Sequence, residues 1–258
     1  MEFDVKKTVE DIIKFIRDYF NINHLKGVVV GISGGKDSSV VASLFVKALG
    51  HENVLGLWLP ANSLESDKED AIKLCKKLNI ELKEFDLNDI YNLYVQNIKD
   101  TNNVLDEYLI DANINLKPRL RMLSLYYFAA MQSKLTKAPY IVAGTSNKCE
   151  RYVGYFTKGG DNVCDISVLG NLLVSEVIKI GDYLEVPYEI CHKIPDDGLS
   201  NLSDEEKLGV KYADIEKYIK EQETGIHENL SDDVRARIKK LHDSNFHKFY
   251  VPTFGSKE

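Results

Sequence analysis

The segment GISGGKDSS at residues 31–39 gathers glycines, hydroxyls, a lysine and an aspartate within nine positions. It follows the apolar run at 28–30 and precedes another, which predicts a loop between a strand and a helix. Free N–H groups at a helix start favour an anion, and Gly34 and Gly35 let the main chain approach a phosphate. Asp37 would repel that phosphate unless a cation such as Mg²⁺ lies between them. The residues therefore describe a phosphate-binding loop with its own metal ligand.

Two common nucleotide motifs do not fit this segment. The pattern G-x-x-x-x-G-K-[ST] would require glycine where Lys36 stands, and G-x-G-x-x-G is also absent. The segment instead resembles the S-G-G-x-D-S loop of the ATP pyrophosphatases, which cleave ATP between the α and β phosphates and adenylate a substrate. The resemblance implies that ATP is bound by Gly31, Ile32, Ser33, Gly34, Gly35, Lys36, Asp37 and Ser38.

Further segments resemble the NAD synthetase family within that group of enzymes. They are NLKPRLRM (115–122), GTSNKCE (144–150), GYFTKGGDNVCD (154–165), KIPDDGLSNLSDEEKLGV (193–210) and the pair at 247–248. The resemblance implies that Asp37 and Glu150 hold Mg²⁺ and that Thr145 contacts ATP. It further implies that deamido-NAD is bound by Arg119, Lys158, Asp165, His247 and Lys248.

The implied activity is that of a ligase forming a C–N bond, in the last step of NAD biosynthesis. The nicotinate carboxylate of deamido-NAD attacks the α-phosphate of ATP, and ammonia then converts the acyl-adenylate to NAD and AMP. ATP is thus a co-substrate and Mg²⁺ the cofactor, and a homodimer is expected. Asp161 or Asp165 could deprotonate ammonium near the adenylate, because only free ammonia attacks. Residues 1–258 are expected to form one synthetase domain without a glutaminase domain, so the nitrogen donor is free ammonia or ammonia from a separate subunit.

Three positions depart from the family pattern. Val174 stands where the family has a lysine that contacts ATP, Asp196 replaces a serine or threonine, and Pro118 replaces an alanine. The lost lysine would weaken nucleotide binding unless another cation compensates. Lys36, where many relatives carry glutamine, is a hypothetical replacement, and Lys36→Gln should then raise the KM for ATP.

Each site residue also has a structural interpretation. Arg119 and Arg121, Lys158 and Lys248 could be solvated surface residues, Glu150 could be exposed, and Asp165 could cap a helix or turn. Two functional alternatives stay open, a catalytically silent nucleotide-binding homologue and a tRNA-modifying ATP pyrophosphatase. The formal net charge of −7 and the absence of a C-x-x-C pair argue against the second alternative.

The elements around the loop alternate between strand and helix, which predicts an α/β fold. We expect a doubly wound, mostly parallel sheet with helices on both faces, of the Rossmann-like adenine nucleotide α-hydrolase type. A polar stretch at 100–117 is expected to precede a long apolar helix from about Leu120 to Leu135. Strands are predicted at 27–32, 54–59, 80–87 and 140–145, and helices at 9–20, 40–49, after a Ser66-x-x-Glu69 capping box, near 174–184 and 211–221, and after Ser231.

Composition limits the remaining possibilities. With 44% hydrophobic and 28% charged residues, the chain is typical of soluble proteins, and no apolar run reaches the length of a membrane span. We expect a cytoplasmic protein that binds neither nucleic acid nor membrane. Cys75, Cys149, Cys164 and Cys191 show neither disulfide nor zinc-site spacing and are expected to be buried thiols.

Overall fold

The computed structural model describes residues 3–102, 105–193 and 203–255, and within them one parallel sheet runs in the order β3-β2-β1-β4-β5. In the register, Val29 lies between Leu55 of β2 and Val142 of β4. The chain builds β2 and β3 on one side of β1 and then returns to add β4 and β5 on the other. The strands are β1 (Gly27–Gly31), β2 (Val54–Trp58), β3 (Glu81–Glu84), β4 (Tyr140–Gly144) and β5 (Ile166–Ser167).

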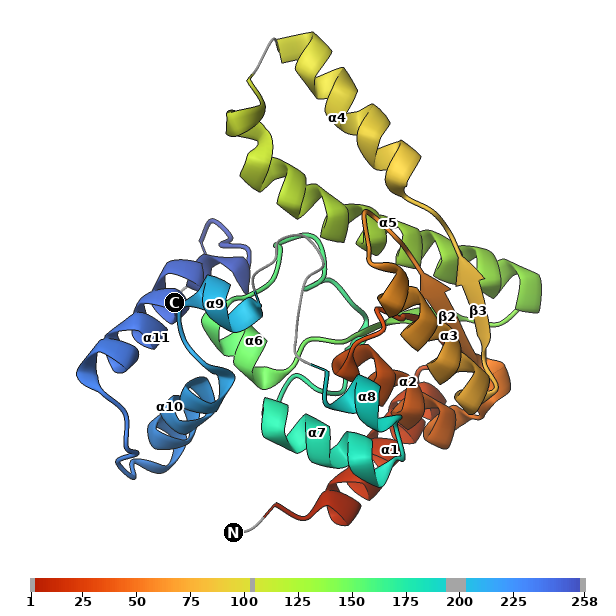
Figure 1. Cartoon of the computed structure of the whole chain (residues 1–258). Helices are drawn as coiled ribbons and strands as arrows, with labels where there is room; N and C mark the ends of the chain where they lie inside the picture. Colours follow the sequence, from red (N-terminus) through yellow and green to blue (C-terminus); the bar gives the residue numbers. More distant parts are fainter. Residues whose placement is uncertain (1–2, 103–104, 194–202, 256–258) are drawn as a thin grey trace.

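Helices cover both faces of the sheet, which confirms the predicted doubly wound α/β class (Figure 1). Val28 and Val30 pack into one core cluster, and Val29 packs into the cluster on the opposite face. Burial on both faces explains why the strand sequence is uninterruptedly apolar. The first face carries α1 (Val5–Ile22), α2 (Lys36–Leu49), α3 (Glu65–Leu78), α7 (Val174–Tyr183) and α8 (Tyr188–Cys191), and the second carries α4 (Asn88–Asn102) and α5 (Ile110–Thr136).

A third core cluster joins the C-terminal helices to α6 beside the sheet. It is built around Cys149, Leu173, Ile215 and Ile238, all buried. The helices concerned are α6 (Lys148–Val153), α9 (Asp204–Leu208), α10 (Tyr212–Thr224) and α11 (Asp232–Asn245), and the short 3₁₀ turns of the chain are η1 (His51–Asn53), η2 (Asp106–Leu109) and η3 (Phe246–Lys248). Of these helices, α6, α9 and α11 contribute residues to the wall of the cavity above the sheet.

Two predicted elements were wrong in detail. The polar stretch before Leu120 is largely helical, because η2 and the first turns of α5 occupy it and α5 continues through Pro118. No capping box begins α3, since Leu64 is its N-cap and Ser66 already lies within the first turn. The acidic first turn of α3, with Glu65 and Asp67, still complements the helix dipole.

Other predictions of local structure are confirmed. The hydroxyl of Ser231 accepts a hydrogen bond from the Val234 N–H and caps α11. All four cysteines are free, with Cys164 half-buried and the other three buried. Among the described ranges, none of the helices combines the length and the hydrophobicity needed to cross a bilayer.

Candidate active site

The GISGGKDSS loop lies at the carboxyl end of β1 and leads directly into α2. The sheet order reverses beside β1, between β1 and β4, which is where open α/β sheets bind ligands. Gly35 is the N-cap of α2 and carries no side chain over the first N–H groups of the helix. The Ser38 hydroxyl accepts from the Ser33 N–H at 3.1 Å, and the Ser39 hydroxyl donates to the Gly35 carbonyl at 2.7 Å. These hydroxyls fix the loop, and no side chain caps the start of α2, where the first N–H groups of the helix can meet an anion.

Gly34 is required at the tip of this loop. Its φ of +79° lies in the left-handed region, and an added Cβ would stand 2.3 Å from the carbonyl oxygen of Asp67 in α3. The side chain of Asp67 is in turn paired with Lys193, with Nζ 2.7 Å from Oδ1. The loop is therefore positioned by direct backbone contact with the start of α3.

Asp37 and Glu150 reach the same end of the sheet from different helices, as the metal-site prediction requires. Asn147 links them, because its Nδ2 donates to Asp37 Oδ1 at 3.3 Å and its Oδ1 accepts from the Glu150 N–H at 3.1 Å. Glu150 Oε2 accepts from the Asn147 N–H at 3.1 Å and completes a capping box on α6. The fully buried Asn147 therefore fixes both carboxylates.

The electrostatics of these carboxylates suit a hard divalent cation. Burial, together with the charge of Asp37, raises the pKa of Glu150 well above its ordinary value. Burial lowers the pKa of Lys36, but the charges of Asp37 and Glu150 outweigh burial and raise that pKa overall. Carboxylate oxygens that repel one another in a buried site are the donor set that Mg²⁺ prefers.

A cavity of about 620 Å³ opens over the loop, within the range of pockets for small-molecule ligands. Its walls come from the loop, α5, the segment at 154–161 and the end of α11. Among the described residues that line it, five are cationic and five are acidic, so the cavity is less acidic than the chain as a whole. The predicted site residues in its lining are Gly31, Ile32, Ser33, Gly35, Lys36, Asp37, Thr145, Glu150, Asp161 and Lys248.

Three predicted dinucleotide contacts lie outside this cavity and hold one another. The exposed Arg119 donates to the Lys158 carbonyl at 3.3 Å from Nη2. Lys158 Nζ donates to the His247 carbonyl at 2.7 Å, and His247 Nδ1 lies 3.0 Å from the Ser244 carbonyl. Gly34 and Ser38 also do not line the cavity: Gly34 lies against the Asp67 backbone, and the Ser38 hydroxyl donates to the Gly35 carbonyl within the loop. The roles of these residues in substrate binding stay predictions.

Asp165 is bound to the sheet. Its Oδ2 accepts from the Val142 N–H at 2.8 Å, its own N–H donates to the Val142 carbonyl at 2.9 Å, and its Oδ1 accepts from the Tyr126 hydroxyl at 3.2 Å. The carboxylate thus satisfies the Val142 N–H of β4 just before β5 begins at Ile166. Its catalytic and substrate-binding roles stay predictions.

Asp161 and Lys248 both line the cavity, and Lys248 is bonded to the same 154–161 segment that carries Asp161. Asp161 Oδ1 accepts from the Thr157 N–H at 2.7 Å, and enclosure by the cavity walls raises the pKa of its carboxyl. Lys248 Nζ donates to the carbonyls of Gly154 and Phe156 at 2.9 and 3.1 Å, and burial lowers the pKa of its ammonium. A carboxylate with a raised pKa is a better proton acceptor than an ordinary aspartate.

Sequence reasoning missed Asn147, which bonds to the cavity residues Asp37 and Glu150, and several charged residues that line the cavity itself. Asn147 lies within GTSNKCE, and its position between Thr145 and Glu150 was the available signal. Arg121 lies in NLKPRLRM, with Nε 3.2 Å from the Leu59 carbonyl, and burial lowers its pKa. The other charged residues that line the cavity and were not assigned a role are Asp67, Lys117, Lys193 and Asp204.

The three departures from the family pattern have different outcomes. Val174 is the first residue of α7 and is buried in the C-terminal core cluster, so its position supplies no charge to the cavity. Pro118 lies within α5 and lines the cavity. Asp196 falls outside the described residues.

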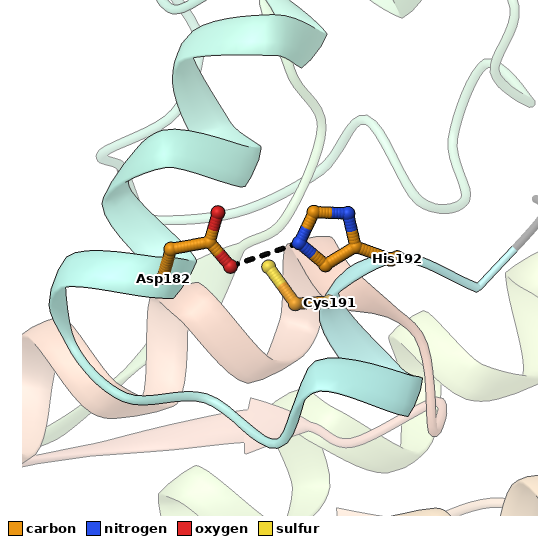
Figure 2. A group of neighbouring side chains, drawn as sticks. All are labelled: Asp182, Cys191 and His192. Atoms are coloured by element: carbon orange, nitrogen blue, oxygen red, sulfur yellow. Dashed lines mark hydrogen bonds and ion pairs between the residues drawn. The ribbon is translucent and has the colours of Figure 1, made fainter.

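One group of metal-ligand types lies away from this cavity, a proximity that the sequence did not predict (Figure 2). Asp182 and His192 are bonded to each other, with 2.9 Å from Oδ1 to Nε2, and Cys191 lies beneath them. The Cys191 thiol is buried and donates to the Ile178 carbonyl, and burial raises its pKa to about 12. A protonated, packed thiol is a poor metal ligand, so we assign Cys191 to the core.

The fold and the loop define an α/β protein of the class that binds nucleotides at the carboxyl end of its parallel sheet. The family model described as NAD synthase matches residues 8–252, and the chain belongs to this family. A similar relative, the NH₃-dependent NAD⁺ synthetase of Archaeoglobus fulgidus, is 38% identical over 250 residues, covering 96% of this chain and 95% of the relative.

Two solved structures resemble the whole chain. The NMN synthetase from Francisella tularensis has a TM-score of 0.86 and 32% identity, with 99% of this chain and 100% of that chain covered. The NH₃-dependent NAD synthetase from Campylobacter jejuni, in complex with the nitrate ion, has a TM-score of 0.80 and 29% identity over 99% of this chain and 100% of that chain.

Proposed function

We propose that this protein is an NH₃-dependent NAD synthetase, which uses ATP and ammonia to convert deamido-NAD to NAD, AMP and pyrophosphate. Membership of the NAD synthase family supports the reaction. The observation that carries the proposal is the placement of Asp37 and Glu150, linked by Asn147, beside the open N–H groups of the phosphate loop. Cleavage of ATP between its α and β phosphates requires charge neutralisation at this point, which the loop N–H groups and a Mg²⁺ ion held by these carboxylates would supply.

Asp37 and Glu150 would hold Mg²⁺, whose charge neutralises the pyrophosphate that leaves. The donor set supports this assignment, because both groups offer carboxylate oxygens and both are fixed by Asn147 rather than by cations alone. The loop N–H groups bind and orient the triphosphate, and Thr145 contacts the nucleotide from the end of β4. The cavity walls exclude water from the activated carboxyl, which would otherwise be hydrolysed.

Asp161 would accept a proton from ammonium. It lines the same cavity, and its raised pKa keeps it a stronger base than an exposed aspartate. Lys248 lines the same cavity and would neutralise an anionic part of the dinucleotide. Arg119, Lys158 and His247 would form the outer part of that binding site, where the surface loops converge.

We further propose that the protein forms a homodimer and is located in the cytoplasm. Within the described residues 88–102, α4 contains no buried residue, and apolar side chains along α4 and α5 are exposed. Examples are Leu93, Leu123 and Tyr127, with exposed fractions of 64%, 61% and 70%. A second copy would cover this surface, and light scattering should give twice the chain mass, while Leu123→Asp should shift the mass toward one chain. Four free cysteines fit a reducing compartment.

A second candidate substrate is nicotinic acid mononucleotide. The match to the NMN synthetase structure favours it, and so does the position of Arg119, Lys158 and His247 outside the cavity. Both substrates present the same nicotinate carboxylate, so the adenylation chemistry would be identical. The two candidates differ only in how much of the ligand the outer residues contact.

One assay tests the function and separates the substrates. The protein is incubated with Mg·ATP and ammonium, with either deamido-NAD or the mononucleotide, and NAD, NMN and AMP are quantified. We expect NAD and AMP in equal amounts and a higher kcat/KM for deamido-NAD. A higher kcat/KM for the mononucleotide would establish the second candidate, and no amide from either substrate at any ammonium concentration would refute both. Amide formation from neither substrate with intact nucleotide binding would instead indicate the silent homologue.

A further inference from the structure

Lys36 occupies an unfavourable position for a cation. It is the first residue of α2, where the helix dipole is positive, and only 7% of its side chain is exposed. Its Nζ lies 3.0 Å from Asp37 Oδ2, while Asp37 Oδ1 is taken by Asn147. The neighbouring carboxylates of Glu150 and Asp204 also act on the Lys36 ammonium. The buried ammonium is therefore stabilised by the carboxylates that would serve a metal.

Tyr212 of α10 encloses the same point. Its ring centroid lies 6.0 Å from Lys36 Nζ, and 6% of the residue is exposed. Among the described residues, its hydroxyl has no hydrogen-bond partner, although Glu150, Asp204 and Asp37 act on it. A buried hydroxyl without a hydrogen-bond partner, close enough to three carboxylates to be affected by their charge, indicates that a further ligand atom belongs at this point.

The charges around Lys36 do not cancel. Three acidic groups, Asp37, Glu150 and Asp204, act on the single ammonium of Lys36, and the pKa of Glu150, raised by burial and by the charge of Asp37, shows that one ammonium does not offset their mutual repulsion. The excess matches a divalent cation, but the ammonium competes with such a cation for Asp37 Oδ2. A metal ion that binds Asp37 Oδ2 would therefore weaken the ion pair between this oxygen and Lys36.

Lys36 is the single cationic residue of the phosphate loop at 31–39, so no other loop residue can take its place. Val174 brings no charge to the cavity. Lys193 is paired with Asp67 and Asp70, each at 2.7 Å. Once Asp37 is neutralised by a metal ion, the flexible four-carbon stem of Lys36 can bring its ammonium to the nearby phosphates.

We propose that Lys36 is an exchangeable counter-ion, which neutralises Asp37 in the nucleotide-free protein and moves to the ATP phosphates when Mg²⁺ takes over the carboxylates. This role rests on the proposed function, because it assigns ATP and Mg²⁺ to the cavity. It predicts opposite effects of one substitution on two ligands. Removing the ammonium should strengthen metal binding without nucleotide and weaken nucleotide binding with metal.

The test compares the wild type with Lys36→Gln in two binding experiments. Mn²⁺ binding without nucleotide is followed by electron paramagnetic resonance, and binding of α,β-methylene ATP with Mg²⁺ is followed by calorimetry. We expect about tenfold tighter Mn²⁺ binding and about tenfold weaker nucleotide binding, the effect of roughly one lost charge interaction. Lys193→Gln is the matched control, since it removes a cation of the same cavity that does not contact Asp37, and its Mn²⁺ affinity should equal that of the wild type.

Each result decides the role of Lys36. Unchanged or weaker Mn²⁺ binding by Lys36→Gln would overturn the counter-ion role, and tighter Mn²⁺ binding with unchanged nucleotide binding would overturn the transfer to phosphate. A thermal melt of Lys36→Gln shows whether the fold is kept, and Lys36→Met, which preserves the length of the stem, repeats the comparison. These binding measurements need no turnover. A wild-type protein that binds both ligands but makes no NAD would therefore refute the proposed function and leave the role of Lys36 intact.

Discussion

Replacing Gly34 with alanine should disable the phosphate loop more than it destabilises the protein. The new Cβ meets two penalties, the left-handed backbone at φ +79° and an overlap with the Asp67 carbonyl oxygen at 2.3 Å. The first costs about 1 to 2 kcal/mol of folding free energy. The second involves backbone atoms on both sides, so the loop and α3 must separate by roughly 1 Å, at a further cost of about 1 to 3 kcal/mol.

That separation moves the loop N–H groups that we propose bind ATP. A misplacement of about 1 Å typically costs 10²-fold in rate, so we expect kcat/KM for ATP to fall by about that factor. Gly225→Ala is the matched control, because its φ is +70° and its Cβ would meet no atom within 4 Å. The control should lose only about 1 to 2 kcal/mol and keep its kinetics.

The assay pairs urea unfolding with steady-state kinetics for both variants. The free energy of unfolding should fall more for Gly34→Ala than for Gly225→Ala, and only Gly34→Ala should lose activity. Equal losses of stability would show that the contact with Asp67 imposes no restraint. An active Gly34→Ala enzyme would refute the assignment of this loop to ATP.

Three further predictions concern acidic residues. Asp161→Asn should lose most amide synthesis at neutral pH and recover as the pH rises, because free ammonia then becomes abundant, and a pH profile at fixed total ammonium that parallels the wild type would exclude Asp161 as the base. Asp165→Ala should reduce the free energy of unfolding by about 1 to 3 kcal/mol, because the Val142 N–H loses its acceptor, whereas unchanged stability with lost substrate binding would make Asp165 a ligand instead. The hydrogen bond from Arg235 lowers the pKa of Glu221 to about 2, so the ionised Glu221 stabilises the fold fully above about pH 4.5, and this stabilisation is lost as the pH falls toward 2. The Tm of Glu221→Gln should therefore fall less between these pH values than the Tm of the wild type. An identical dependence of Tm on pH would contradict the pairing.

Local patterns of sequence predicted the phosphate loop because its chemistry is local. The strand, the glycines of the loop and Asp37 follow one another directly in the chain. The apolar run at 28–30 predicts a strand that is buried on both faces. The start of α5 was missed because its sequence is polar and contains Pro118, while its packing against β1 and β4 comes from distant residues. Tertiary contacts here override a weak local preference.

The distant walls of the cavity were harder to predict for the same physical reason. Lys193 pairs with Asp67, which is 126 positions away in the chain, and only the fold brings them together. The bond between Asp165 and the Val142 N–H could not be predicted either, because the need of that N–H for an acceptor becomes visible only when the register of β4 and β5 is known. Residue types identified the chemistry of the site, and the arrangement of the sheet determined which residues share it.

The transfer of oxygen from substrate to nucleotide is the most direct test of whether the nicotinate carboxylate is adenylated. Deamido-NAD labelled with ¹⁸O in its nicotinate carboxylate is converted with Mg·ATP and ammonium, and the AMP is examined by mass spectrometry. If the carboxylate attacks the α-phosphate at the GISGGKDSS loop, each AMP formed from doubly labelled substrate carries one ¹⁸O atom, and pyrophosphate carries none. Unlabelled AMP, or release of ADP and phosphate, would contradict the account.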